Sequence, residues 1–241
     1  MIFVKDFEIS SSKVDINEEI INKGIMEILE DTATRHAESI GDGLTDREKR
    51  GTGWVVVDWK IKVIKRPKYN QTLNVLTWGR EEKKCYIYRD FEIYNDENEL
   101  CVIATSKWVI LNLKNRKIGR ISEELLKAYN PEVGVSVFDN EKLNKIKEPP
   151  NYQSSIKYQV KRRDIDLNNH MHNVYYLDMA YEALPEEVYK NKNFDNIRIM
   201  YKKEIKLNDI IECKYTHLKD KDIVGIYSEN GEILHSIVEF Y

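Results

Sequence analysis

The sequence lacks the residue patterns of several large protein classes. Among its 241 residues are three cysteines, Cys85, Cys101 and Cys213, which are far apart and show no Cys-x-x-Cys spacing. An odd, scattered set of this kind supports neither a disulfide framework nor a zinc site. The chain also has no Gly-rich phosphate loop and no Gly-x-Ser-x-Gly motif. These absences argue against nucleotide chemistry and against a serine hydrolase of the α/β type.

Long apolar runs and an excess of charge are absent as well. No stretch approaches eighteen apolar residues, so no segment is predicted to span a membrane. The first six residues already include an acidic one and no apolar segment follows, so we expect no signal or transit peptide. The net charge of −3 argues against a nucleic-acid binder. With 41% apolar and 33% charged residues, the composition predicts a globular protein, with the cytoplasm as its default location.

Hydrophobic periodicity predicts one long helix and several strands in the first half of the chain. The helix is expected over 15–39, because Ile21, Ile25, Ile28 and Leu29 recur at helical spacing. Alternating or continuously apolar segments predict strands over 3–9, 54–63, 73–78, 85–94 and 100–111. The segment 41–53 is polar and is expected to be a loop, whereas Ser122 is expected to cap a short helix that ends at Tyr129.

The second half repeats this plan after a polar segment that carries three prolines. Residues 131–150 are interpreted as a linker between domains 1–130 and 151–241. A helix is expected over 173–184, ended by Pro185. Strands are expected over 155–160, 197–205, 210–217, 223–227 and 233–241, with a hairpin turn at Asn230-Gly231.

A short local match supports a duplication of one unit. The residues Val14-Asp15-Ile16-Asn17 parallel Ile165-Asp166-Leu167-Asn168, and each set stands just before the long helix of its half. A helix packed on an antiparallel sheet buries both the helix and the inner face of the sheet. We therefore predict an α+β protein built from two such units, with two long helices packed on a continuous antiparallel sheet.

The densest cluster of polar residues contains Asp166, Asn168 and His170, which are spaced by two. In an extended segment, residues two apart point to the same side, which would bring a carboxylate, an amide and an imidazole together. This set suits the polarisation of a carbonyl group and the transfer of a proton. The spacing is equally compatible with a polar loop at a helix entry, where Asp and Asn act as caps and turn formers.

A second candidate is Glu204, at the end of an otherwise apolar predicted strand. It follows Lys202 and Lys203, so a solvated strand end is the alternative interpretation. His170 and His172 could bind a metal in principle, but no second pair of ligands is evident, so we predict neither a metal nor a cofactor. The isolated histidines at 36, 217 and 235 are interpreted as surface or internally hydrogen-bonded residues, and the cysteines as small core residues.

The sequence resembles a known family. Residues 164–176 look like the Asp-x-Asp-x-Asn-x-His-x-Asn-Asn-x-x-Tyr signature of fatty acyl-acyl-carrier-protein (acyl-ACP) thioesterases. The segments 74–78, 88–91, 104–109 and 201–204 are similar to family segments in the same order, so the resemblance covers nearly the whole chain.

This resemblance implies a double hot-dog fold and hydrolysis of long-chain acyl thioesters presented by acyl carrier protein. It implies catalytic roles for Asp166, Asn168, His170 and Glu204. Two positions depart from the family pattern. Ile205 stands where plant members carry a cysteine, which excludes a thiolate nucleophile there, and His172 replaces the first asparagine of the usual pair. The lack of a plastid transit segment suits a bacterial protein.

The two halves are expected to differ in function. Aligning Asp15 with Asp166 places Glu19 opposite His170, so only the C-terminal copy is predicted to be catalytic. The N-terminal copy is predicted to shape the acyl pocket. The candidate substrate-binding residues are Ile21, Ile25, Ile28 and Trp59 for the acyl chain, and Arg162, Arg163, Lys202 and Lys203 for an acidic carrier protein.

Two other functions fit the same pattern. One is a hot-dog thioesterase that acts on acyl-coenzyme A, and the other is a non-catalytic acyl-binding protein. The sequence also leaves open the acyl chain length, the choice between a general-base and a covalent anhydride route, and the oligomeric state, a homodimer included.

Overall fold

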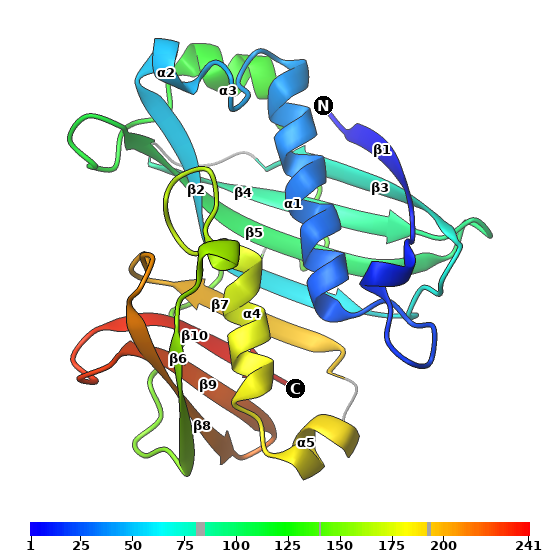
Figure 1. The fold of residues 1–241 in the computed structure, drawn as a ribbon. Helices are drawn as coiled ribbons and strands as arrows, with labels where there is room; N and C mark the ends of the chain where they lie inside the picture. The colour runs from blue at the N-terminus through cyan, green and yellow to red at the C-terminus, as the bar shows by residue number, and fades with distance from the viewer. Residues whose placement is uncertain (81–84, 140, 192–193) are drawn as a thin grey trace. The chain divides into compact units, whose positions relative to one another are not determined.

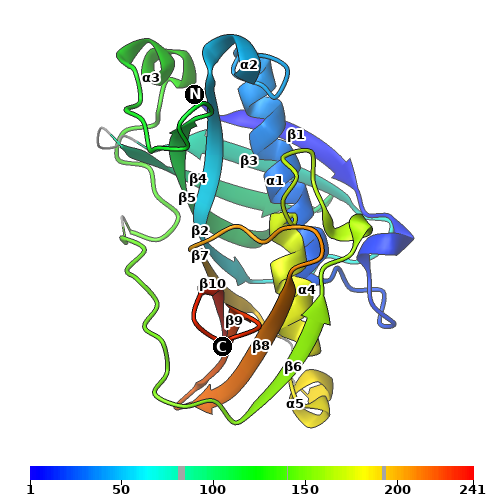
Figure 2. The same cartoon turned by 60° about the vertical axis from the view of Figure 1, so that its left-hand side comes forward.

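The computed structural model describes residues 1–80, 85–139, 141–191 and 194–241. They form two compact units, Met1–Leu143 and Asn144–Tyr241. In each unit one long helix lies across one face of an antiparallel sheet (Figure 1), and the second view shows the same two layers (Figure 2). Within the described ranges, no helix is both long enough and apolar enough to cross a membrane.

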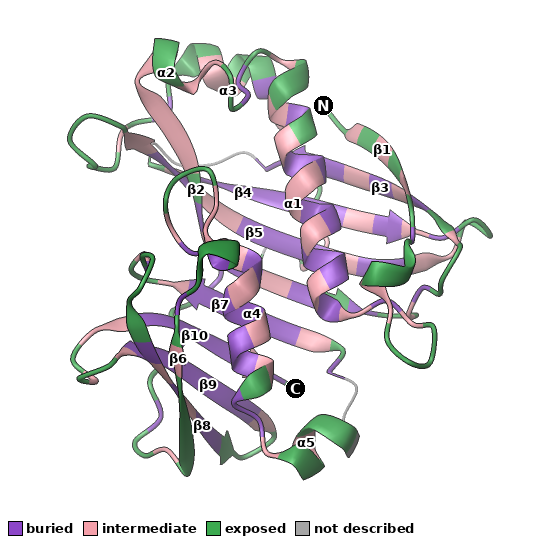
Figure 3. Cartoon of the chain, viewed as in Figure 1, coloured by how far each residue is buried: buried purple, intermediate pink, exposed green. Residues whose placement is uncertain are grey.

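The first unit contains a sheet in which all neighbouring strands are antiparallel. Its order is β1 (Phe3–Glu8), β3 (Thr72–Gly79), β4 (Tyr86–Tyr94), β5 (Leu100–Asn112) and β2 (Thr52–Val63). Helix α1 (Asn22–Ser39) contacts β1 and β3 and buries Ile25, Ile28 and Leu29, as the helical spacing predicts (Figure 3). Helix α3 (Glu123–Tyr129) begins as expected, because the Ser122 hydroxyl accepts the N–H of Leu125.

The second unit has the same strand order. Its sheet runs β6 (Ser154–Gln159), β8 (Ile210–Leu218), β9 (Lys221–Ser228), β10 (Leu234–Phe240) and β7 (Asn196–Tyr201), again with antiparallel neighbours. Helix α4 (Asn173–Glu182) contacts β9 and β10. A 3-10 turn precedes the long helix in both units, η1 (Ser11–Lys13) in the first and η2 (Arg162–Asp164) in the second.

The duplication extends to individual backbone hydrogen bonds. Ile20 donates to the carbonyl of Pro67 at 2.9 Å, and Met171 donates in the same way to Ile205 at 2.8 Å. The residue before the first acceptor is Arg66, and the residue before the second is Glu204. The two copies can therefore be compared position by position at the helix entry and at the turn that faces it.

Several element boundaries differ from the sequence-based expectation. Helix α1 begins at Asn22 and not at Asp15, because the Asp15 carboxylate accepts the N–H groups of Asn17 and Glu19 and closes a turn that competes with helix. The strand expected over 197–205 ends at Tyr201. Two short helices were not expected: α2 (Arg47–Arg50) lies in the predicted loop, and α5 (Glu186–Asn191) follows Pro185.

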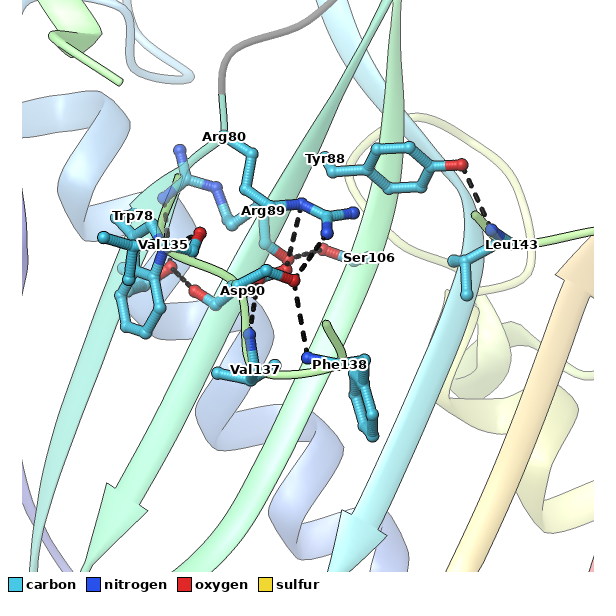
Figure 4. A network of polar contacts seen from close by, with 12 residues as sticks. Trp78, Arg80, Tyr88, Arg89, Asp90, Ser106, Val135, Val137, Phe138 and Leu143 are labelled. Carbon is cyan, nitrogen blue, oxygen red and sulfur yellow. Dashed lines mark hydrogen bonds and ion pairs between the residues drawn. The ribbon is translucent and has the colours of Figure 1, made fainter. Parts of the chain in front are cut away.

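After α3 the chain packs against the sheet of the first unit. We call residues 131–139 the strap, and Figure 4 shows it on the sheet face away from α1. The Val137 N–H donates to the Asp90 carboxylate at 3.1 Å, and the Trp78 indole N–H donates to the Val135 carbonyl at 3.4 Å. Trp78 and Asp90 are partners across β3 and β4, so both side chains lie on this face.

Asp90 is fully buried beneath the strap, and burial raises the pKa of its carboxyl group. The Arg80 guanidinium lies 3.6 Å from this carboxylate and is buried as well. The carboxylate therefore joins the strap, the sheet and a buried cation.

We predict that Asp90→Ala lowers the free energy of unfolding by about 3 kcal/mol, because it removes the carboxylate beside the buried Arg80 guanidinium and leaves the Val137 N–H without its acceptor. Urea denaturation measures this change. Asp6→Ala is the control, since Asp6 is exposed and its carboxylate accepts one side-chain hydrogen bond from Asn74. We expect that change to cost at most about 0.5 kcal/mol. Equal effects of the two substitutions would show that Asp90 does not hold the strap.

Candidate active site

A tight turn between η2 and α4 brings three of the candidate residues together. The Asp166 Oδ1 atom accepts the N–H groups of Asn168 at 2.8 Å and of His170 at 3.2 Å, and Oδ2 accepts the Asn168 side-chain amide at 3.1 Å. Asn169 has a φ of 64°, a left-handed conformation that asparagine tolerates better than most residues. Of the two interpretations left open by the sequence, the structure shows the helix-entry loop, and a turn closed by Asp166 unites these residues.

The fourth candidate meets the third across this turn. The Nε2 atom of His170 lies 3.2 Å from an Oε atom of Glu204, and the two side chains are 18% and 35% exposed. Glu204 lies just beyond the end of β7 and not within a strand. The hydrogen bond from Met171 to Ile205 ties the two segments together beside this contact. An imidazole and a carboxylate are thus in contact where a substrate and water can reach them.

The base of the turn is anchored by Asp164. This residue is buried, and its carboxylate accepts the Tyr158 hydroxyl and the Lys161 N–H, both at 2.7 Å. Its carbonyl accepts the N–H of His172, the residue just before α4, at 2.8 Å. Asp164 therefore connects the start of α4 to the turn of Asp166. His172 occupies the N-cap position of α4 but forms no capping hydrogen bond with its side chain.

The four basic candidates flank the site within the second unit. Lys202 and Lys203 immediately precede Glu204, and both are exposed. Lys202 also lies 3.4 Å from the Glu148 carboxylate. Arg162 and Arg163 are exposed on η2, four and three residues before Asp166. The structure therefore places positive side chains beside both segments that carry the polar candidates.

The four apolar candidates lie in the first unit. Ile25 and Ile28 are buried on α1, and Ile21 is half-buried at the start of this helix. Trp59 is fully buried in β2, with its ring 5.4 Å from that of Phe91. These residues thus belong to the apolar interior of that unit.

The first unit contains a second copy of the turn, but different side chains occupy the positions of His170 and Glu204. Asp15 accepts the N–H groups of Asn17 at 2.9 Å and of Glu19 at 3.0 Å, so Glu19 occupies the position of His170. Arg66 occupies the position of Glu204. Its guanidinium donates to the Ile20 carbonyl at 2.9 Å, so the side chain is directed back to its own helix entry. This copy has no imidazole–carboxylate pair.

Two buried residues of the second unit were not among the predicted site residues. His235 on β10 was interpreted as a surface or internally hydrogen-bonded histidine, and the second alternative is confirmed: it is 5% exposed and its Nδ1 atom lies 3.1 Å from the Lys203 carbonyl. Tyr176 on α4 is 3% exposed, and its ring centroid lies 5.2 Å from that of Tyr201. Tyr176 is the last residue of the family signature, which was the available signal. Nothing in the local sequence marks His235.

Two of the three cysteines are buried in strands, and the third is exposed. Cys101 and Cys213 are buried, as expected for core residues, and burial raises the pKa of the Cys213 thiol to about 12. Cys85 is exposed, just before β4, so its assignment to the core is wrong. Within the described parts of the chain, no group of three or more His, Cys, Asp or Glu residues could hold a metal ion.

Comparison with solved structures defines the class of protein. The chain matches a 12:0-ACP thioesterase from Umbellularia californica with a TM-score of 0.85 at 20% identity, covering 99% of this chain and 96% of that one. An acyl-ACP thioesterase from Bacteroides thetaiotaomicron matches with a TM-score of 0.80 at 19% identity and the same two coverages. The fold is therefore the double hot-dog, as the sequence predicted.

Comparison with protein families defines the particular family. The acyl-ACP thioesterase N-terminal domain matches residues 1–129, and the acyl-ACP thioesterase C-terminal domain matches residues 147–238. The chain belongs to the acyl-ACP thioesterase family. It is 27% identical over 228 residues to the chloroplast oleoyl-acyl carrier protein thioesterase 1 of Arabidopsis thaliana, a match that covers 88% of this chain and 62% of that protein. It is 24% identical over 245 residues to the chloroplast dodecanoyl-ACP hydrolase of Cinnamomum camphora, covering 95% and 63%. The chain thus spans less than two thirds of the length of these two relatives.

Proposed function

We propose that the protein hydrolyses the thioester bond of fatty acyl-ACP, releasing a fatty acid and the carrier protein. The observation that carries the proposal is the 3.2 Å contact between His170 and Glu204 beside the turn of Asp166. It is supported by the match of the family's two domains to nearly the whole chain. The contact supplies a base and a proton carrier in one partly exposed place.

In the proposed mechanism, Glu204 and His170 act on a water molecule. The Glu204 carboxylate accepts a proton from water while the water oxygen attacks the thioester carbon. The carbon–sulfur bond then breaks, and His170, which receives this proton from Glu204 across their 3.2 Å contact, passes it to the departing sulfur. The Asn168 amide, with N–H groups near the start of α4, holds the carbonyl oxygen as its negative charge develops. Direct attack by Glu204, which forms a mixed anhydride that water then cleaves, would use the same three residues, with Asp166 closing the turn in both routes.

We propose that the carrier protein docks on the basic side chains of the second unit. Arg162, Arg163 and Lys203 are exposed beside the two catalytic segments, and acyl carrier protein is acidic. Lys202 and Arg163 contribute less, because Glu148 lies 3.4 Å from the ammonium group of Lys202 and Asp164 lies 3.6 Å from the guanidinium of Arg163. Charge complementarity of this kind mainly accelerates association.

We further propose that the reaction takes place in a bacterial cytoplasm. Solved acyl-ACP thioesterases of this fold include a bacterial one, from Bacteroides thetaiotaomicron, as well as a plant one, so the fold is not confined to plants. The two plant relatives compared by sequence are chloroplast proteins. A bacterial cytoplasm would bring the enzyme and its acylated carrier protein together.

We predict that Glu204→Ala and His170→Ala each lower kcat on acyl-ACP by about a hundredfold or more, because general acid–base groups contribute roughly 10²–10⁴ in rate. Release of the carrier thiol measures turnover. Glu229→Ala is the matched control in the same unit, since Glu229 is exposed and pairs only with Lys157 among the ion pairs described. It should stay within about twofold of wild type. Near-wild-type turnover by Glu204→Ala would contradict the mechanism. If the enzyme hydrolysed the matching acyl-coenzyme A faster than acyl-ACP, acyl-coenzyme A would be the substrate instead.

We predict that Glu19→Ala leaves kcat within about threefold of wild type. A carboxylate with a reference pKa of about 4.3 cannot replace an imidazole of about 6.5 near neutral pH. The neighbouring position carries Arg66, so the first copy also has no base there. His170→Ala is the comparison variant, because His170 occupies the equivalent position of the second copy. A loss in Glu19→Ala as large as that in His170→Ala would assign chemistry to the first copy.

We predict that Ile28→Ala shifts the preferred acyl chain by a few carbons toward longer substrates. The first unit is proposed to hold the acyl chain with Ile21, Ile25, Ile28 and Trp59, and each methylene contributes about 0.8 kcal/mol on burial. Met179→Ala is the control, since Met179 lies at the equivalent position of α4 and is also buried. Chain-length profiles are normalised to the best substrate of each variant, which corrects for any loss of folded protein. An unchanged profile for Ile28→Ala with a shifted one for Met179→Ala would assign the pocket to the second unit.

A further inference from the structure

Buried polar side chains face the backbone on both sides of Glu204. The His235 imidazole, from β10, bonds to the carbonyl of Lys203, the residue before Glu204, at 3.1 Å. The Tyr176 hydroxyl, from α4, lies near the backbone of Ile205, the residue after it. The two side chains thus reach the turn from a strand and from a helix. We call Tyr176 and His235 the clamp.

The chemical state of His235 is fixed by its partner. A carbonyl oxygen can only accept, so Nδ1 of His235 carries the proton in this bond. Burial lowers the pKa of the imidazole and keeps the ring neutral. The carbonyl of His235 also accepts the N–H groups of Lys202 at 2.8 Å and of Lys203 at 3.2 Å. This one residue therefore holds the segment before Glu204 through both its backbone and its side chain.

Tyr176 is buried on α4, and its ring meets that of Tyr201, the last residue of β7, edge to face at 5.2 Å. Burial raises the pKa of its hydroxyl, and the negative charges of Glu204 and Asp166 raise it further. The ring is therefore held in place at the end of β7, where the segment that carries Glu204 begins.

The first copy shows what the same turn looks like without the clamp. There Ile64 and Lys65 donate to the carbonyl of Cys101 at 2.8 and 3.1 Å, which places Cys101 at the position of His235. Counting from the first residue of each long helix, Ile25 occupies the position of Tyr176. The backbone forms the same hydrogen bonds with a thiol and an apolar side chain in these places. The clamp is therefore not needed to fold the turn.

We propose that Tyr176 and His235 are positioning residues that hold the Glu204 carboxylate in contact with His170. The inference rests on the proposed function, in which that contact activates water. A turn held only by its backbone can shift by fractions of an ångström, and small displacements of a catalytic group lower the rate considerably. The copy without the catalytic pair also lacks the clamp, which is the pattern that this role requires.

The test compares three changes that each remove one polar group. Tyr176→Phe removes the hydroxyl, and His235→Cys introduces the residue of the first copy. We expect each to lower kcat on acyl-ACP about tenfold while KM stays within about twofold, because positioning acts on the chemical step. Tyr215→Phe is the matched control, since Tyr215 is also buried in the second unit and its hydroxyl donates to Asp222 at 2.8 Å. Its kcat should remain within about twofold of wild type.

A rescue and a double substitution separate positioning from general loss of structure. His235→Asn keeps a side-chain N–H that can donate to the Lys203 carbonyl, so its kcat should return to within about threefold of wild type. In a Glu204→Ala background, Tyr176→Phe should cause no further loss, because its effect acts through Glu204. Additional loss in that background would overturn the inference.

The outcomes also distinguish this inference from the proposed function. Loss of turnover in Glu204→Ala, together with wild-type kcat in Tyr176→Phe and His235→Cys, would overturn the clamp and leave the proposed function standing. Full turnover in Glu204→Ala would overturn the proposed function and the clamp with it. Equal losses in Tyr176→Phe and Tyr215→Phe would assign Tyr176 to stability alone.

Discussion

An aspartate that accepts the N–H groups two and four residues ahead is the interaction on which the site depends. Asp166 forms these bonds in the second unit, and Asp15 forms them in the first. Aspartate is suited to closing such a turn, because its short carboxylate can accept from the N–H groups of the residues that follow it. The turn is thus a feature of the fold, and the chemistry lies in the side chains that it carries. In the second unit it carries His170 toward Glu204.

The strands and the repeated order of elements could be predicted, because both depend on local periodicity. Ile25, Ile28 and Leu29 recur at helical spacing, and all three are buried on α1. The start of this helix could not be predicted from the same pattern. The competing turn at Asp15 depends on a side chain bonding to the backbone, which hydrophobic spacing does not record. For the same reason, the spacing of Asp166, Asn168 and His170 left an extended segment and a turn as equal alternatives.

The contacts that complete the site are non-local, and no spacing rule reports them. His235 and Lys203 are far apart in the chain, and the sequence alone does not distinguish a buried histidine from a solvated one. Asp90 is a similar case, because its role under the strap depends on Val137 and on a buried guanidinium. Such residues could be suspected from the family resemblance, as with Tyr176. Their partners become visible only when distant strands and helices meet.

The duplicated backbone separates the requirements of folding from those of chemistry. The two copies share the hydrogen bonds of their turns but carry different types of side chain at four positions. At each of these positions the first copy lacks a group that the proposed reaction uses. In the first copy these positions carry Glu19, Arg66, Ile25 and Cys101; in the second they carry His170, Glu204, Tyr176 and His235. Arg66 bonds to its own helix entry, so the first turn is stabilised by a guanidinium in place of a poised carboxylate. If each side chain served only the fold of the turn, the four would have no reason to differ together. Their joint replacement is expected if His170, Glu204 and the two positioning residues, Tyr176 and His235, function together in the second unit.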